Sequence, residues 1–128
     1  MRDQISLTIP EEEEYRGVAR LVLGGLAARL NLTYEHLEDL ELALEGVLER
    51  GASKGDLTVT FVAEGGSIET LVGPFGPDAF RELERPVPEG LGLRRILETV
   101  SDGFQLENRE GFRWVRVRKS FEARVQGE

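Results

Sequence analysis

"LTVTFVAEGGSIETLVG", residues 57–73, alternates apolar and polar side chains on either side of a Glu-Gly-Gly turn. Such alternation is typical of β-strands that bury one face, and a short glycine-containing turn joins two of them into an antiparallel hairpin. A second stretch of this kind, "FQLENREGFRWVRVRKSF" at 104–121, reverses direction near Glu110 and Gly111. The two hairpins therefore predict a mixed, mostly antiparallel sheet.

The remaining segments predict one more strand and three helices. "ISLTIP" at 5–10 is typical of a short half-buried strand that a proline ends. Helices are expected over about 12–30, after the N-cap residue Thr33, and over about 91–100. Their expected apolar stripes are Val18, Leu21, Val22 and Leu26 in the first helix and Leu37, Leu40, Leu44, Val47 and Leu48 in the second. This order predicts an α+β fold, a two-layer α/β sandwich with the three main helices on one face of the sheet.

Length and composition narrow the function classes. A chain of 128 residues predicts a single domain, here 1–121, followed by a polar tail over 122–128. The absence of cysteine and the single histidine, His36, argue against thiolate metal sites and Ser-His-Asp catalysis. A net charge of -8 argues against general nucleic-acid binding. No apolar run is long enough to cross a bilayer and no signal peptide is recognisable, so a cytoplasmic location is expected.

Two longer stretches carry a family resemblance. They are "LTIPEEEEYRGVARLVLGGLAARLNLTYEHLEDLELALEG" at 7–46 and "EGLGLRRILETVSDGFQLENREG" at 89–111. Together they resemble the GHKL, or Bergerat-type, ATPase fold of the histidine-kinase-like superfamily, in its bacterial anti-sigma factor and serine-protein kinase branch. The resemblance implies a regulator of transcription that binds a sigma factor and an antagonist protein. It also implies a homodimer that phosphorylates a serine of the antagonist with Mg-ATP.

The second helix departs from the catalytic pattern that the resemblance implies. Active relatives carry a glutamate there that acts as general base, and an asparagine four residues later that holds Mg²⁺. An ungapped alignment of "DLELALEGVLERGA" places Gly46 and Arg50 at these positions. Glycine cannot accept a proton and arginine cannot bind a metal ion. A slip of one residue would bring in Glu45 or Glu49, although we favour the interpretation that these two form a solvated i,i+4 pair. No catalytic or metal-binding residue is therefore assigned.

The adenine and phosphate elements are also incomplete. The family's D-x-G turn, whose aspartate binds adenine, corresponds to residues 73–76, where Pro74 replaces the aspartate and Gly76 keeps the glycine. Asp78 is a weak substitute because Pro77 restricts the turn. Gly90 and Gly92 match the glycine pair that cradles phosphate, while Glu89 replaces a further glycine, and the lid segment between 76 and 90 is shorter than in active relatives. The degenerate nucleotide-binding positions are Arg50, Gly76, Gly90 and Gly92.

Three functions remain open at this point. The first is an anti-sigma-factor-like regulator that binds protein partners, has lost or weakened ATP binding and needs no cofactor. The second is an active serine kinase that uses ATP and Mg²⁺, and the third is a purely structural subunit. Two surfaces are candidates for partner binding: the acidic side of the second helix, and the basic stretch 113–119, which either meets an acidic partner or protects an edge strand from aggregation. For the basic stretch we favour the edge-strand interpretation.

Overall fold

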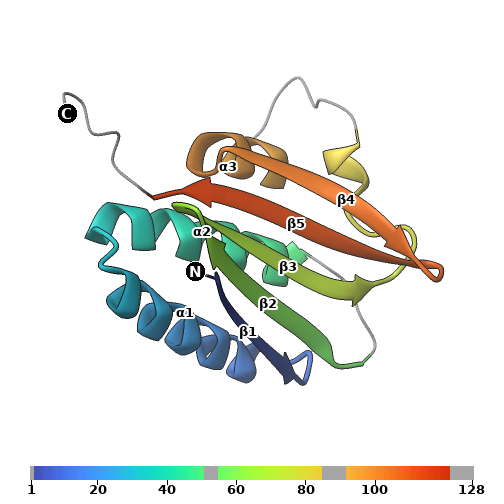
Figure 1. Cartoon of the computed structure of the whole chain (residues 1–128). Helices are drawn as coiled ribbons and strands as arrows, with labels where there is room; N and C mark the ends of the chain where they lie inside the picture. The colour runs from blue at the N-terminus through green and yellow to red at the C-terminus, as the bar shows by residue number, and fades with distance from the viewer. Residues whose placement is uncertain (1, 51–54, 85–91, 122–128) are drawn as a thin grey trace.

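The computed structural model describes residues 2–50, 55–84 and 92–121. Within these ranges five strands form one sheet in the order β1-β2-β3-β5-β4, and every neighbouring pair is antiparallel. The helices lie on one face of this sheet and the other face is open (Figure 1).

The strands are β1 (Arg2–Ile9), β2 (Leu57–Glu64), β3 (Ser67–Phe75), β4 (Gly103–Arg109) and β5 (Phe112–Ser120). The helices are α1 (Arg16–Leu30), α2 (Tyr34–Arg50) and α3 (Leu93–Val100), with 3-10 turns η1 (Glu13–Tyr15) and η2 (Arg81–Leu83). The predicted α+β sandwich is confirmed.

Both predicted hairpins are present and use the same turn geometry. Gly65 and Gly66 join β2 to β3 with φ of 63° and 83°. Glu110 and Gly111 join β4 to β5 with φ of 53° and 85°. Two consecutive residues with positive φ match the right-handed twist of the flanking strands, which explains why glycine occurs in both turns.

The core lies between the sheet and the helices. Val59, Val72 and Val115 stand opposite one another on three adjacent strands and are almost fully buried. Leu23 from α1 and Leu97 from α3 are fully buried in the same apolar cluster. Thr33 caps α2 as expected, because its hydroxyl accepts a hydrogen bond from the backbone N–H of His36 at 3.1 Å.

The predicted apolar stripe of α1 is partly wrong. Leu21 is 77% exposed and Val18 is 42% exposed, whereas Ala19 and Leu23 are fully buried. Apolar residues occur on two neighbouring faces of this helix, so the period alone does not choose between them. The face with small alanines allows α1 to approach the sheet closely, and packing therefore selects it.

The basic stretch 113–119 is not an edge strand, because β5 lies between β3 and β4. Most of its cations are also engaged within the chain. Arg116 donates to Glu69 at 2.8 Å and to Glu107 at 2.5 Å, and its guanidinium lowers the pKa of the Glu107 carboxyl. Arg113 and Lys119 form ion pairs with Glu84 and Asp39, respectively. The interpretation of this stretch as edge protection is therefore wrong, while a surface for an acidic partner stays a prediction that could use only the exposed Arg118 without breaking an ion pair.

The two edges of the sheet are β1 and β4. As predicted, Ile5, Leu7 and Ile9 of β1 share one face, since they stand opposite the buried residues Phe61, Val59 and Leu57 of β2. The predicted polar tail over 122–128 lies outside the described residues. Among the helices that the structure describes, none is long and apolar enough to span a lipid bilayer.

Candidate functional site

The contact between α2 and α3 lies at the position where the resemblance implies a catalytic glutamate. Gly46 is buried on α2, and a Cβ atom built on it would stand 2.9 Å from Cδ1 of Leu93, the first residue of α3. Leu93 itself is fully buried. A side chain at position 46 therefore requires Leu93 to move, because real Cβ contacts are not this short. This space is occupied by the apolar core.

A register slip would bring Glu45 or Glu49 to the position of the catalytic glutamate. In the structure one of them is bound elsewhere and the other is exposed. Glu45 forms an ion pair with Arg20 of α1, so it is engaged on the α1 side of α2 rather than being freely solvated. Glu49 is exposed. Arg50 is the last residue of α2. The expected solvated pair of glutamates is thus replaced by a cross-helix ion pair at Glu45.

The segment expected to be the adenine-binding turn belongs largely to a strand. Pro74 lies within β3, after a cis peptide bond, and the strand continues to Phe75. Gly73 lies directly against the Trp114 ring, since a Cβ on it would be 2.4 Å from Cδ2 of that ring. The turn begins only at Gly76, whose carbonyl accepts the N–H of Ala79 at 3.1 Å. A proline in the strand provides no side-chain acceptor for an adenine amine.

Asp78, the weak substitute for the adenine-binding aspartate, lies two residues beyond Gly76. It is exposed and pairs with Arg81 at 3.2 Å on the surface. At the other end of the connection, Gly92 caps α3, and its carbonyl accepts the N–H of Ile96 at 3.2 Å. Gly92 has φ of -69°, so its backbone does not require glycine. Gly90 lies outside the described residues. The structure brings Gly46 next to the start of α3, and neither Gly46 nor Pro74 has a side-chain acceptor, while the carboxylate of Asp78 is paired with Arg81 on the surface.

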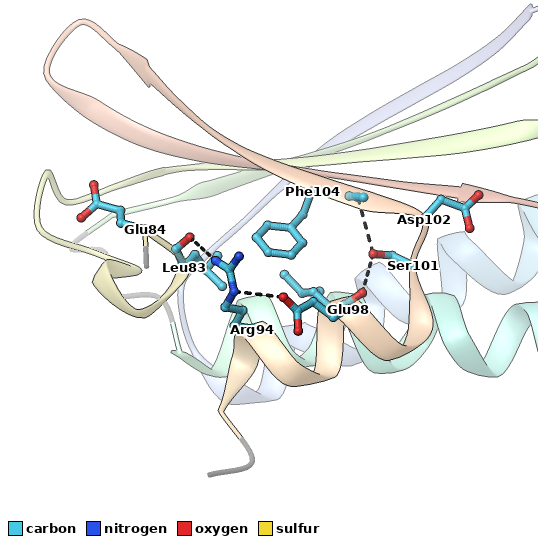
Figure 2. A pocket seen from close by; sticks show the side chains of 9 residues that line it. Leu83, Glu84, Arg94, Glu98, Ser101, Asp102 and Phe104 are labelled. Atoms are coloured by element: carbon cyan, nitrogen blue, oxygen red, sulfur yellow. Dashed lines mark hydrogen bonds and ion pairs between the residues drawn. The ribbon is translucent and has the colours of Figure 1, made fainter. Parts of the chain in front are cut away.

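A hollow of about 500 Å³ lies beside α3, between η2 and β4 (Figure 2). Arg94 crosses it, donating to the Leu83 carbonyl at 2.8 Å and to Glu98 at 3.0 Å, with its guanidinium 5.4 Å from the centre of the Phe104 ring. At the end of α3, also in the lining of the hollow, the Ser101 hydroxyl donates to the Leu97 carbonyl at 2.6 Å. Arg94, Glu98 and Ser101 are thus bonded to groups of the hollow itself, whereas Glu84 and Asp102 have their partners outside it, in Arg113 and Ser120.

The structure also shows two residues whose role the sequence did not suggest. Arg94 of α3 holds Leu83 by its carbonyl, and Arg113 of β5 donates to the Ala79 carbonyl at 3.2 Å and pairs with Glu84. One arginine from α3 and one from β5 thus hold the segment around η2. The Arg94–Glu98 pair is a local i,i+4 pattern, but no local pattern marks the contacts with the backbone carbonyls, because Leu83 and Ala79 lie 11 and 34 residues away. In the part of the chain that the structure describes, no three histidine or carboxylate side chains gather in a way that could hold a metal ion.

No family model matches this chain. It is 30% identical to serine-protein kinase RsbW of Listeria monocytogenes, and the alignment covers 98% of this chain and 93% of that protein. The chain belongs to the RsbW family of serine-protein kinases. The RsbW proteins of Bacillus velezensis and Bacillus subtilis are 28% and 26% identical, each over 85% of this chain and 81% of their own length.

Membership of the RsbW family confirms the family expected from residues 7–46 and 89–111. The alignment with the Listeria RsbW spans 147 positions, whereas this chain has 128 residues, so that relative has segments that this chain lacks. The fold and nearly the full length are therefore shared with RsbW kinases, while position 46 is a glycine packed against Leu93.

Proposed function

We propose that this chain is an anti-sigma-factor-like regulator of the RsbW family that acts by binding protein partners and has lost or weakened nucleotide binding. The partners would be a sigma factor or its antagonist, and the protein would act in the cytoplasm as a single domain over residues 1–121. This proposal treats the nucleotide-binding positions Arg50, Gly76, Gly90 and Gly92 as remnants. No cofactor is required for it.

The observation that supports this proposal best is the packing of Gly46 against Leu93. A general base must reach the attacking hydroxyl within hydrogen-bond distance, so it needs both a side chain and space for it. At position 46 there is no side chain, and the nearest space is occupied by a buried leucine. Pro74 adds a second departure, because the strand there presents no carboxylate to an adenine amine. Loss of both groups would weaken nucleotide binding.

The alternative is an active serine kinase, and the names of the relatives support it, since all three compared proteins are called serine-protein kinases. In that case Glu45 or Glu49 would serve as the base after a register slip. Glu45 would first have to leave its ion pair with Arg20. The kinase would use ATP and Mg²⁺, which supply the phosphoryl group and its charge neutralisation.

Isothermal titration with ATP, with and without Mg²⁺, distinguishes the two functions. The regulator predicts no tight, Mg²⁺-dependent binding, since each lost contact to the base or metal weakens binding by about 1–3 kcal/mol and 1.4 kcal/mol is a factor of ten. Micromolar Mg²⁺-dependent binding would overturn this part of the proposal. Glu45→Gln and Glu49→Gln would then identify the base, with the exposed Glu38→Gln on the same helix as the matched control.

Partner binding is tested separately, by copurifying the chain with a sigma factor or an antagonist domain encoded beside it. Binding without added nucleotide supports the regulator. If neither protein binds in the presence or absence of Mg-ATP, the anti-sigma function is wrong whatever the outcome of the titration.

We also propose a homodimer. In support of it, β1 is an edge strand of eight residues whose outer side is unpaired within the described chain. A second copy can pair with such an edge. The mass of the free chain by light scattering tests this assembly.

A further inference from the structure

The outer edge of β4 is a regular strand edge that lacks a second partner. β4 is the last strand of the sheet, and among the described residues it pairs only with β5. Natural edge strands are commonly protected from further pairing by a proline, an inserted bulge or a lysine. β4 contains neither proline nor lysine, and its register with β5 runs without a bulge. Its two charged residues, Glu107 and Arg109, are bonded to each other at 2.8 Å. This edge is therefore open to another strand.

The turn between β4 and β5 decides which backbone groups of this edge are free. Arg109 and Phe112 flank the two-residue turn, so they form the hydrogen-bonded pair that closes it. Hydrogen-bonded and non-hydrogen-bonded pairs then alternate along the two strands. The N–H and C=O groups of Phe104, Leu106 and Asn108 consequently point away from β5. They provide three positions at which a further strand can both donate and accept hydrogen bonds.

The apolar core reaches this edge and is only partly covered there. Phe104 and Leu106 stand opposite the buried core residues Val117 and Val115, so they share the face that looks toward the helices. Both pack against the core but are themselves only partly buried. The hollow beside α3 lies at the same edge, with Phe104 and Leu97 in its lining (Figure 2). Because paired residues on neighbouring strands point to the same face, a strand added to β4 would place alternate side chains over this hollow.

The charges of the hollow are unevenly arranged. Figure 2 shows Arg94 and Asp102 at its opposite ends. Arg94 is already bonded to Glu98 and to the Leu83 carbonyl. Asp102 is exposed and accepts a hydrogen bond from the backbone N–H of Ser120, but no cation lies within salt-bridge distance of it among the described side chains. The end of the hollow at Asp102 therefore attracts a cationic side chain.

A second copy of this chain does not meet that requirement. Antiparallel pairing of two β4 strands centred on Leu106 places Asp102 of one copy opposite Glu110 of the other. Two like charges directly opposite each other destabilise a strand pair. The charge pattern thus favours a different protein with a cation at this position.

We propose that the β4 edge accepts an extended segment of a partner protein as a sixth strand, with apolar side chains toward α3 and a lysine or arginine at the end that meets Asp102. In strand addition of this kind the main-chain hydrogen bonds supply affinity and pockets for alternate side chains supply specificity. Here Phe104, Leu106 and Asn108 make the main-chain bonds, and the hollow receives the apolar side chains. This inference rests on the proposed protein-binding function and names the form and chemistry of the partner.

A synthetic peptide of about nine residues, the length of a long strand, provides the probe. It alternates valine with threonine and carries a lysine at each end, so that either strand direction brings one lysine to Asp102. A matched peptide has glutamate in place of both lysines. Binding is measured by fluorescence anisotropy, and hydrogen exchange of the backbone amides is followed by NMR. We expect the lysine peptide to slow exchange at Phe104, Leu106 and Asn108, with little change at residues 105 and 107, and to bind more weakly as salt increases.

Asn108→Pro is the decisive variant. Asn108 is exposed and its N–H points away from β5, so proline there removes a donor for the added strand and retains the pairing with β5. We expect it to weaken binding of the lysine peptide by about tenfold. Asn108→Ala is the matched control, because it keeps the N–H, and it should change the affinity by less than about twofold.

Asp102→Asn tests the charge without changing the backbone. It should weaken binding of the lysine peptide by about threefold or more and leave the glutamate peptide unaffected. Glu35→Gln removes the same charge from an exposed position on α2 and should have no effect.

The proposal is overturned if Phe104, Leu106 and Asn108 are already protected from exchange in the free chain, since the edge would then be covered. It is also overturned if the slowed amides lie on β1, if the glutamate peptide binds as well as the lysine peptide, or if Asn108→Pro binds like Asn108→Ala. A lower mass of the free chain in Asn108→Pro would make a second copy the occupant and overturn it as well. Because the peptide assay contains neither nucleotide nor sigma factor, its failure is distinguishable from failure of the proposed function.

Discussion

The stability of Gly46→Ala measures whether the α2–α3 contact leaves room for a side chain at position 46, where the resemblance implies a glutamate. Two opposing effects decide the stability change. Alanine inside a helix stabilises it by roughly 0.5–1 kcal/mol relative to glycine. The new methyl group, however, starts 2.9 Å from Cδ1 of the fully buried Leu93. Overpacking of this kind costs about 1–3 kcal/mol.

Gly25→Ala is the matched reference for this substitution. Gly25 is an exposed glycine inside α1, and its Cβ position is open. It therefore receives the gain in helix propensity without the steric cost. We expect Gly25→Ala to raise the free energy of unfolding by roughly 0.5–1 kcal/mol and Gly46→Ala to leave it unchanged or lower it by up to about 2 kcal/mol. The difference between the two variants is then about 1–3 kcal/mol.

Urea unfolding at one fixed protein concentration measures both values, so that dimerisation does not distort the comparison. A double-mutant cycle with Leu93→Ala isolates the contact. Leu93→Ala alone should cost about 2–5 kcal/mol, but part of this loss should be recovered beside alanine at position 46, giving a coupling of about 1 kcal/mol or more. If Gly46→Ala is as stable as Gly25→Ala, the contact is loose, position 46 has room for a carboxylate, and the reasoning behind the proposed loss of catalysis is refuted.

Three further predictions follow from the structure. Hydrogen bonds from Ser120 hold the pKa of the Asp102 carboxyl below its usual value, so this residue stabilises the fold above pH about 4, and its contribution decreases as the pH falls through the lowered pKa. Asp102→Asn should therefore lower the midpoint of thermal unfolding at pH 7, and by progressively less as the pH falls below about 4; an equal loss throughout would contradict this. Gly73→Ala should destabilise the protein by about 1–3 kcal/mol in urea unfolding, because its Cβ would stand 2.4 Å from the Trp114 ring, and an unchanged midpoint would show that the ring can move aside. If the chain is a homodimer through β1, light scattering should give twice the mass of one chain, and a proline at Ser6 in this edge strand should reduce it to one, whereas a monomer at high concentration would refute the dimer.

The family resemblance and the local elements were predictable because they depend on short-range patterns. Strict alternation over 57–63 and 67–72 requires one face of each strand to be buried, and paired turn residues with positive φ place the reversals at 65–66 and 110–111. The N-cap at Thr33 is equally local, since its hydroxyl reaches an N–H only three residues later. No long-range information is needed for any of these.

The order of strands in the sheet required the tertiary structure. The cations of the stretch 113–119 favoured an edge strand protected from aggregation, but β5 pairs with both β3 and β4 and so lies inside the sheet. Its arginines pair with carboxylates on neighbouring strands, as Arg116 does with Glu69, 47 residues away. Hairpin pairing is decided by the turn, whereas the pairing of one hairpin with the other depends on contacts that no local pattern encodes.

The sequence by itself determined that positions 46 and 74 carry no carboxylate, since glycine and proline have none in any fold. Only the tertiary structure decided that the space beside Gly46 is filled by Leu93, that Glu45 is held by Arg20, and that Leu21 rather than Leu23 faces outward. The physical reason is that side-chain chemistry belongs to a single residue. Close packing and charge pairing instead depend on which distant residues the fold brings into contact.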